Sequence, residues 1–301
     1  MEFIQNYSGE LAALMTALFW TATALAFESA SLKVGSMSVN VIRLFMGLTF
    51  LTIFNLVTKG SFFPFIVEGN NWLWLVLSGL IGFVFGDYFL FHSYTIIGSR
   101  FSMLIMTLVP PITAFFSWFI LRERLSLLNY IGMCLTFSGI ALAIFNRKNG
   151  KEKLTLKLAP KGILFAFFGA LGQALGLVLS KLGMGVSDPF AATQVRLVAG
   201  LAGFVIIVTI LGRWTGVRSA LSNRAGLKAI LIGSFFGPFL GVSFSLIAVK
   251  HTAAGIASTL MAIVPVLIIP PAILLYKQKV TIWEVAGAVL SVGGVALFFI
   301  R

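Results

Sequence analysis

Two distant stretches of this chain share one pattern. Residues 100–142 read RFSMLIMTLVPPITAFFSWFILRERLSLLNYIGMCLTFSGIAL, and residues 255–297 read GIASTLMAIVPVLIIPPAILLYKQKVTIWEVAGAVLSVGGVAL. At this offset of 155 residues, the matched pairs are Pro110 with Pro265, Gly132 with Gly287 and Gly139 with Gly294. Because proline and glycine constrain or free the backbone, their recurrence indicates a duplicated structural unit and not merely a shared apolar composition.

The rest of the chain is equally apolar. Of its 301 residues, 59% are hydrophobic and 10% are charged, which is outside the range of soluble globular proteins. Windows of about 17 to 25 apolar residues are long enough to cross a bilayer as helices. They predict ten spans, near 9–27, 38–58, 72–95, 99–121, 127–145, 161–180, 190–212, 228–249, 253–276 and 282–300.

The ten predicted spans fall into two halves. A basic linker, 147–160, separates a first repeat, 9–146, from a second, 161–301, and at an offset of 153 residues Gly9 falls on Gly162 and Arg43 on Arg196. Five spans per half is an odd number, so the second half must enter the membrane from the opposite side. We therefore expect an all-helical membrane protein built as two inverted repeats around a central cavity, the plan of secondary transporters.

Several motifs carry a family resemblance. The runs TALFWTATAL (16–25), IRLFMG (42–47) and VRLVAG (195–200), together with the two long stretches quoted above, resemble the EamA-type repeats of the drug/metabolite transporter superfamily. The resemblance implies a ten-helix transporter of small organic metabolites and leaves the substrate open. One departure is YKQK (276–279), which stands where LRER (121–124) keeps an acidic residue and weakens any role for a glutamate there.

Small residues spaced by four predict close helix packing. Ser78, Gly82 and Gly86 form one such ridge, and Gly233, Gly237 and Gly241 form its copy. In lipid, such ridges let backbones approach closely, so we expect them to pack helices.

The stretch GDYFLFHSYT (86–95) places polar groups in an apolar run. In the second half Asp87, Tyr88 and His92 are replaced by Val242, Ser243 and Ile247, so the cluster is not a requirement of the repeat. A carboxylate in hydrocarbon needs a partner or a cavity. Asp87 is therefore either held by a neighbouring helix or is a site carboxylate that binds a cationic group or carries a proton, with Tyr88 beside it. His92 lies nearer the membrane edge, where a satisfied histidine is an alternative to a substrate contact.

A second asymmetric pair joins this cluster. Trp20 on the first span lies opposite Gln173 on the sixth, and the resemblance implies that Trp20 is the family's tryptophan. An indole offers a flat apolar wall with one donor, and a mid-membrane amide needs partners. We expect Trp20 and Gln173 to flank a small organic substrate, with core packing as the alternative for Trp20.

Arginine and proline occupy matched positions in both halves. Arg43 and Arg196 lie a few residues into their helices, which favours anchoring at the membrane face or a salt bridge to a neighbouring helix; gating or contact with an anionic substrate is the alternative. Pro110, Pro111 and Pro265 are expected to kink the fourth and ninth helices, either as hinges of the site or as structural bends.

Several classes of protein are disfavoured. The chain carries a formal charge of +13, but its basic residues crowd into short connections, which favours contact with lipid headgroups over nucleic acid. One cysteine and two histidines supply neither a metal site nor a catalytic set, and no GxxxxGK motif provides for ATP, so no enzyme, cofactor or metal is expected. We expect a monomeric exporter in a prokaryotic plasma membrane, working by alternating access with proton coupling left open. A lipid flippase, which would need a lateral opening, is the alternative, and an intramembrane enzyme is the alternative from another class.

Orientation is left open by two opposing arguments. Ten spans place both termini on one side, where the loops hold six basic residues against fourteen on the other, with Arg43 and Arg196 completing the 22. The positive-inside rule then predicts external termini, whereas the resemblance implies cytoplasmic ones.

Overall fold

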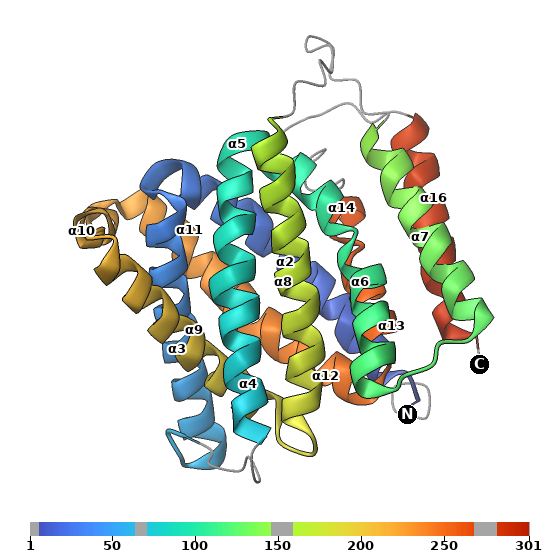
Figure 1. The fold of residues 1–301 in the computed structure, drawn as a ribbon, viewed down its shortest axis with the longest axis horizontal. Coiled ribbons are helices and arrows are strands. Elements are labelled where there is room, and N and C mark those ends of the chain that lie inside the picture. Colours follow the sequence, from blue (N-terminus) through green and yellow to red (C-terminus); the bar gives the residue numbers. More distant parts are fainter. Residues whose placement is uncertain (1–5, 64–70, 146–158, 268–281, 301) are drawn as a thin grey trace.

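The computed structural model describes residues 6–63, 71–145, 159–267 and 282–300. All regular secondary structure in these ranges is helical, and the helices stand side by side in a single bundle (Figure 1). The prediction of an all-helical protein is confirmed. Residues 147–158 of the predicted linker, 147–160, lie outside the described residues.

The described residues of the first half form six α-helices and two π-helical segments. They are α2 (Ser8–Val34), α3 (Ser36–Lys59), α4 (Asn71–Gly79), η1 (Leu80–Gly86), α5 (Asp87–Met106), α6 (Val109–Phe116), η2 (Ser117–Leu121) and α7 (Leu127–Phe145).

The described part of the second half continues in the same way. Its elements are α8 (Pro160–Met184), α9 (Pro189–Ile210), α10 (Trp214–Ser222), α11 (Arg224–Ser234), η3 (Phe235–Gly241), α12 (Val242–His251), α13 (Ala254–Met261), α14 (Val264–Leu267), α16 (Ile282–Ala296) and the short 3₁₀ turn η4 (Leu297–Phe299).

The duplication extends to irregular details of the helices. The π-helical segments η1 and η3 coincide at the offset of 155 residues, and so do two interruptions, at Thr107–Leu108 and Ala262–Ile263. Both interruptions come two residues before a proline, Pro110 or Pro265, where a missing N–H stops the helical hydrogen bonds. The repeat seen in the sequence is therefore a repeat of backbone geometry.

Six helical runs are long and apolar enough to cross a bilayer. They are Ser8–Val34, Ser36–Lys59, Asn71–Ile97, Pro160–Met184, Pro189–Ile210 and Arg224–His251. Four shorter apolar helices, Val109–Leu121, Leu127–Leu142, Ala254–Leu267 and Val285–Phe299, occupy the remaining predicted spans. Val109–Leu121 follows an interruption, and Ala254–Leu267 contains one and runs to the last residue described before 282.

Helices of one half pack mainly on helices of the other. The α4–η1–α5 rod packs on α8, its counterpart α11–η3–α12 packs on α2, and the pairs α3 with α9, α6 with α13 and α7 with α16 complete the pattern. In Figure 1, α7 and α16 lie together at one edge of the bundle, far from α10 at the other. Each half is thus stabilised by the other.

The small-residue ridges lie at these contacts. A Cβ on Gly176 of α8 would come 2.8 Å from Gly82 Cα, and one on Gly237 would come 2.8 Å from a methyl of Thr23 on α2. The predicted role of the ridges in helix packing is confirmed by these approaches.

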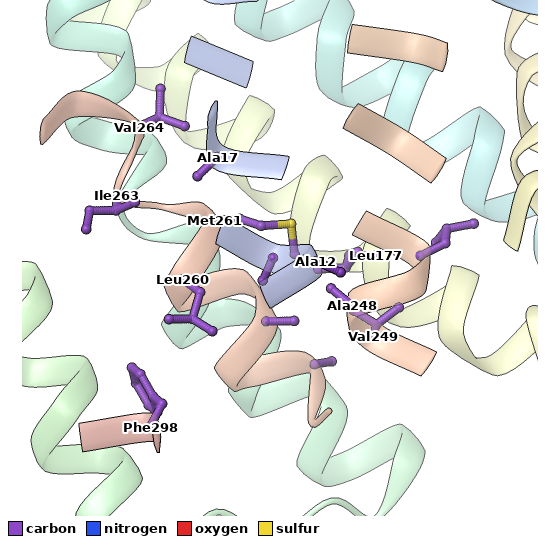
Figure 2. Close-up of a cluster of buried hydrophobic side chains, with 14 of the residues drawn as sticks. Ala12, Ala17, Leu177, Ala248, Val249, Leu260, Met261, Ile263, Val264 and Phe298 are labelled. Atoms are coloured by element: carbon purple, nitrogen blue, oxygen red, sulfur yellow. The ribbon is translucent and has the colours of Figure 1, made fainter. Parts of the chain in front are cut away.

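A compact apolar cluster fills the end of the bundle that holds the termini. Figure 2 shows Ala12 and Ala17 of α2 among Met261, Leu177 and Ala248, side chains from α13, α8 and α12. Its small residues let four helices meet closely.

Two helix boundaries and one additional helix differ from the sequence-based expectation. Helix α2 continues past residue 27 to Val34, because Phe27, Ala30 and Ser31 remain buried although Glu28 is charged. The helical pattern of α5 runs on through the connection expected at 96–98. The short amphipathic helix α10 was not predicted, because windows of bilayer length cannot detect nine residues with two buried positions, Val217 and Ala220.

Candidate functional site

A cavity of about 160 Å³ lies where the two halves meet. Its described lining comes from both halves: α2, α3, η1, α5 and α6 from the first, and α8, α9, η3, α12, α13 and α14 from the second. The pair α7 and α16 contributes none of it. Helices α3 and α9, which carry Arg43 and Arg196, are therefore part of the cavity wall.

Asp87 is the centre of the polar side of the cavity. It begins α5 directly after η1, is 6% exposed, and forms an ion pair with Arg43 of α3. Gln173 of α8 donates from Nε2 to Asp87 Oδ1 at 2.6 Å and reaches the carbonyl oxygen of Gly82 at 3.2 Å. Both carboxylate oxygens are thus engaged by neighbouring helices.

The π-helical segment η1 helps to position these groups. The Asp87 backbone N–H points to the carbonyl of Gly82, a five-residue step, so the helix is locally widened there. At Gly86 the backbone of α8 comes so close that an added Cβ would lie 3.2 Å from Gln173 N. This close approach places the Gln173 amide beside Asp87.

Arg43 lies in the interior and not among headgroups. Its side chain is largely buried, with a residue exposure of 4%, and its Nε donates to Asn40 Oδ1 at 2.9 Å. Its guanidinium carbon lies 4.9 Å from the centre of the Phe91 ring and 5.6 Å from that of Phe27. Of the roles that the sequence left open for Arg43, the contact that the structure shows is a salt bridge to a neighbouring helix.

Arg196 mirrors Arg43 but has a different environment. It is 5% exposed, and its guanidinium carbon lies 4.9 Å from the centre of the Phe83 ring. Its buried Nε has no hydrogen-bond partner, and within the described residues it forms no ion pair. Anchoring at a membrane face does not fit a guanidinium in this position.

Trp20 forms an apolar wall of the cavity. Thr23, Ala24 and Phe27 line the cavity from the same face of α2, at the spacing of neighbouring helical turns. Gly241 of η3 leaves room for the indole, because a Cβ there would lie 2.7 Å from Trp20 Nε1.

Tyr88 and His92 are not brought into this site. Neither lines the cavity, and their rings pack on each other with centroids 4.5 Å apart. His92 Nδ1 lies 2.9 Å from the Tyr88 carbonyl oxygen, and its ring contacts Phe165 of α8. One residue along a helix turns a side chain by about 100°, so Tyr88 points away from the face that Asp87 occupies. The expectation that Tyr88 and His92 join Asp87 at the site is not what the structure shows.

Some lining residues were missed by the sequence reasoning. Tyr94 is buried and lines the cavity seven residues after Asp87, a spacing that places both on one helix face. That spacing was available as a signal. Phe83 also lines the cavity, beside the Arg196 guanidinium, and no sequence pattern indicated that it would.

The expected proline kinks lie beside the cavity. Residues on both sides of the two interruptions line it, including Met106, Thr107, Val109, Met261 and Val264. Pro265 itself is a lining residue, whereas Pro110 is buried behind the wall and Pro111 is exposed on the outside of α6. The interruptions thus shape the wall of the cavity.

Polar contacts tie the helices at the end that holds the termini. Lys181 of α8 pairs with Glu123 Oε1 at 2.6 Å, and Glu123 Oε2 accepts from the Ala254 N–H, at the start of α13, at 2.8 Å. Lys181 also donates to the Thr252 carbonyl at 2.7 Å. At the opposite end, the counterpart contact is apolar: a Cβ on Gly162 would meet Ile96 and Ile97. These described helix contacts at the two ends therefore differ in chemistry.

Comparisons with known proteins agree with this architecture. The sequence profile of the EamA-like transporter family matches residues 7–145 and 160–300. An uncharacterized transporter of Clostridium kluyveri is 24% identical over 231 residues, 76% of this chain and 72% of that protein. The uncharacterized transporter YyaM of Bacillus subtilis is 27% identical over 229 residues, 73% of this chain and 70% of that protein.

Two further proteins are similar to this chain. Human solute carrier family 35 member G1 is 25% identical over 235 residues, 76% of this chain and 62% of that protein. A solved crystal structure superposes with a TM-score of 0.73 at 18% identity, covering 97% of this chain and 96% of its own, and supports the fold alone.

Proposed function

The chain belongs to the EamA-like transporter family, and from that premise we propose that it is a secondary active transporter that moves a small organic metabolite through the central cavity. The family is one of membrane transporters and not of enzymes. What the chain carries, and in which direction, belongs to the proposal.

The observation that carries the proposal is the charged cavity between the two halves. Its described lining holds three buried charged side chains, Arg43, Asp87 and Arg196, at the junction of the inverted repeats. Two interrupted helices border the same space. Inverted-repeat transporters place their substrate at such a junction, where interrupted helices line the site.

The unlike ends of the bundle support alternating access. Opening toward the termini requires breaking the contacts of Lys181, Glu123 and Thr252, whereas opening at the other end separates the contact of Gly162 with Ile96 and Ile97. A substrate in the cavity can therefore be exposed to one side at a time. Export through a prokaryotic plasma membrane, and coupling to a proton carried by Asp87, are parts of the proposal that follow the family resemblance and the buried carboxylate.

The test is untargeted metabolite profiling of the medium from cells that express the protein. Asp87→Asn removes the charge that pairs with Arg43, and Asp188→Asn is the matched control, because Asp188 is a half-exposed acid paired with Lys59 outside the cavity. We expect a metabolite that accumulates with the wild type and with Asp188→Asn, but not with Asp87→Asn at equal membrane abundance.

Each other outcome has a definite meaning. Faster depletion from the medium would show import, and an equal effect of all three proteins would remove Asp87 from the mechanism. No change relative to cells without the protein would contradict the proposed transport from the cell.

A further inference from the structure

The cavity carries an unbalanced charge. Among the described residues that line it, two guanidinium groups face a single carboxylate, and each of the three residues is at most 6% exposed. Arginine stays protonated in proteins, so the cavity has a net charge of about +1 when Asp87 is ionised.

Asp87 forms its direct ion pair with Arg43 and attracts Arg196 only through space. Its Oδ2 is paired with Arg43 Nη2, and its Oδ1 accepts from Gln173 Nε2. Arg43 is satisfied further by Asn40. Each Asp87 oxygen therefore already accepts one strong donor, and neither of these donors comes from Arg196.

Arg196 is the uncompensated group. Its Nε is buried without an acceptor, and the partner that the structure shows for its guanidinium is the face of the Phe83 ring. A ring face offers a weak, non-directional attraction, far less than a carboxylate offers to a buried arginine. A buried charge of this kind is costly unless a counter-charge arrives.

We propose that Arg196 binds the carboxylate of the transported substrate, which is therefore a monocarboxylate with an apolar body. The inference rests on the proposed transport function and names the substrate class of the same cavity. One negative charge neutralises the cavity, whereas a doubly charged phosphate would leave an excess. The planar fork of the guanidinium also matches a carboxylate in two parallel hydrogen bonds.

The remaining walls fit the rest of such a molecule. Trp20, Phe27, Leu177 and Met261 present apolar surface to the cavity. The ammonium group of an amine or of a zwitterionic amino acid would need a carboxylate that is not already paired. Asp87, the carboxylate of the described lining, is paired with Arg43 and Gln173. The earlier alternative, in which Asp87 selects a cationic substrate, is disfavoured for the same reason.

The test measures binding of matched probes to the purified full-length protein in detergent. Phenylacetate carries a single negative charge, phenylacetamide is neutral, phenethylamine is a cation and phenyl phosphate is a dianion, all on an aromatic body. Pentanoate tests whether an aliphatic body is accepted. Dissociation constants come from calorimetry and from the rise in melting temperature that a ligand of the folded state produces.

We expect phenylacetate or pentanoate to bind the wild type and the neutral and cationic probes not to. Arg196→Gln should weaken binding of the acid by about 10- to 100-fold, the usual effect of losing a hydrogen-bonded charge. Arg196→Lys, which keeps the charge without the fork, should lose less. Arg218→Gln changes an exposed arginine of α10 and should leave the dissociation constant within about twofold.

The melting curves of the unliganded variants show whether each one folds, so a lost interaction is separable from misfolding. Equal binding of the amide or the amine, tighter binding of the dianion, undiminished binding to Arg196→Gln, or no binding of either acid would overturn the assignment. Metabolite profiling reports transport independently. If a neutral metabolite is transported and neither acid binds, the transport function is supported and the carboxylate substrate is rejected. If an acid binds and no metabolite is transported, the carboxylate site is supported and the transport function is rejected.

Discussion

At the residue scale, removing the charge of Arg196 and removing the charge of Asp87 should change the stability of the protein in opposite directions. Arg196→Met removes an uncompensated cation and should raise the stability of the unliganded protein by about 1–3 kcal/mol. Asp87→Asn instead leaves Arg43 without its carboxylate and should lower stability by about 3–5 kcal/mol. Thermal melting of the purified proteins in buffer without carboxylates measures both changes.

The matched control is Arg218→Met, the same substitution at an exposed position, which should change the melting temperature little. If Arg196→Met melts lower than the wild type by as much as Asp87→Asn does, Arg196 is a structural charge with a partner, and its proposed role in binding loses support.

The sequence anticipated some of these residues and missed others for physical reasons. Asp87, Trp20 and Gln173 stand out because each is replaced by a different residue type at the matching position of the other half, and all three line the cavity. The arginines look peripheral because they recur and lie seven residues into their helices. Seven residues are roughly 10 Å of helix, enough to carry a guanidinium to the middle of the bundle when it points inward. Which face of a helix turns toward the cavity depends on packing between helices. That packing places Asp87 in the cavity and Tyr88 outside it.

At the scale of elements, the contact between α4–η1–α5 and α8 should depend on the absence of side chains. Gly176→Ala would place a Cβ 2.8 Å from the backbone of Gly82, and neither backbone can move cheaply. We expect a loss of about 1–3 kcal/mol, seen as a lower melting temperature, because overpacking forces such shifts. The contact also holds Gln173 beside Asp87, so transport should fall as well.

Gly293→Ala makes the same chemical change on α16, where a Cβ meets nothing within 4 Å. It should match the wild type in both melting temperature and transport. Equal melting of the two variants would show that α8 and η1 are not packed as closely as their glycines indicate.

Element positions were the most predictable feature of this fold. Ten apolar windows correspond to the described helices because bilayer length imposes one size on them. The helix interruptions followed the prolines, but π-helical segments left no such mark: η1 contains no proline, whereas η3 contains Pro238. Helix α10 escaped detection because its burial is local to two small side chains.

At the scale of the whole molecule, the repeat predicted the correspondence of the halves but not how they pair. An offset states which helices are equivalent and says nothing about which ones touch. The structure pairs each half's third span with the other half's first span, so that the cavity becomes a product of both halves. The two halves have similar backbones but differ in a few cavity side chains, such as Asp87. These differences give the cavity its preference for a ligand of one charge.

The distribution of charge across the whole molecule predicts its orientation. The described chain ends lie at one end of the bundle and α10 lies at the other (Figure 1). Exposed basic residues gather at the α10 end, namely Lys33, Arg213, Arg218, Arg224 and Lys228. The other end exposes Arg122 and Arg124 and holds Lys59, Lys181 and Lys250, which are engaged by Asp188, Glu123 and backbone carbonyls. The positive-inside rule therefore places α10 in the cytoplasm and the termini outside.

Labelling with a membrane-impermeant maleimide on intact cells checks this orientation. In a Cys134→Ser background, which removes the chain's one native thiol, Ser126→Cys reports on the terminus end and Ser219→Cys on α10, both at exposed positions. Ser126→Cys should react on intact cells and Ser219→Cys only after permeabilisation. The reverse pattern would show that α10 and its arginines face outward, against the charge rule. The contacts of Lys181 with Glu123 would then close the cavity toward the cytoplasm, so the same labelling also decides which compartment the substrate must enter from in this conformation.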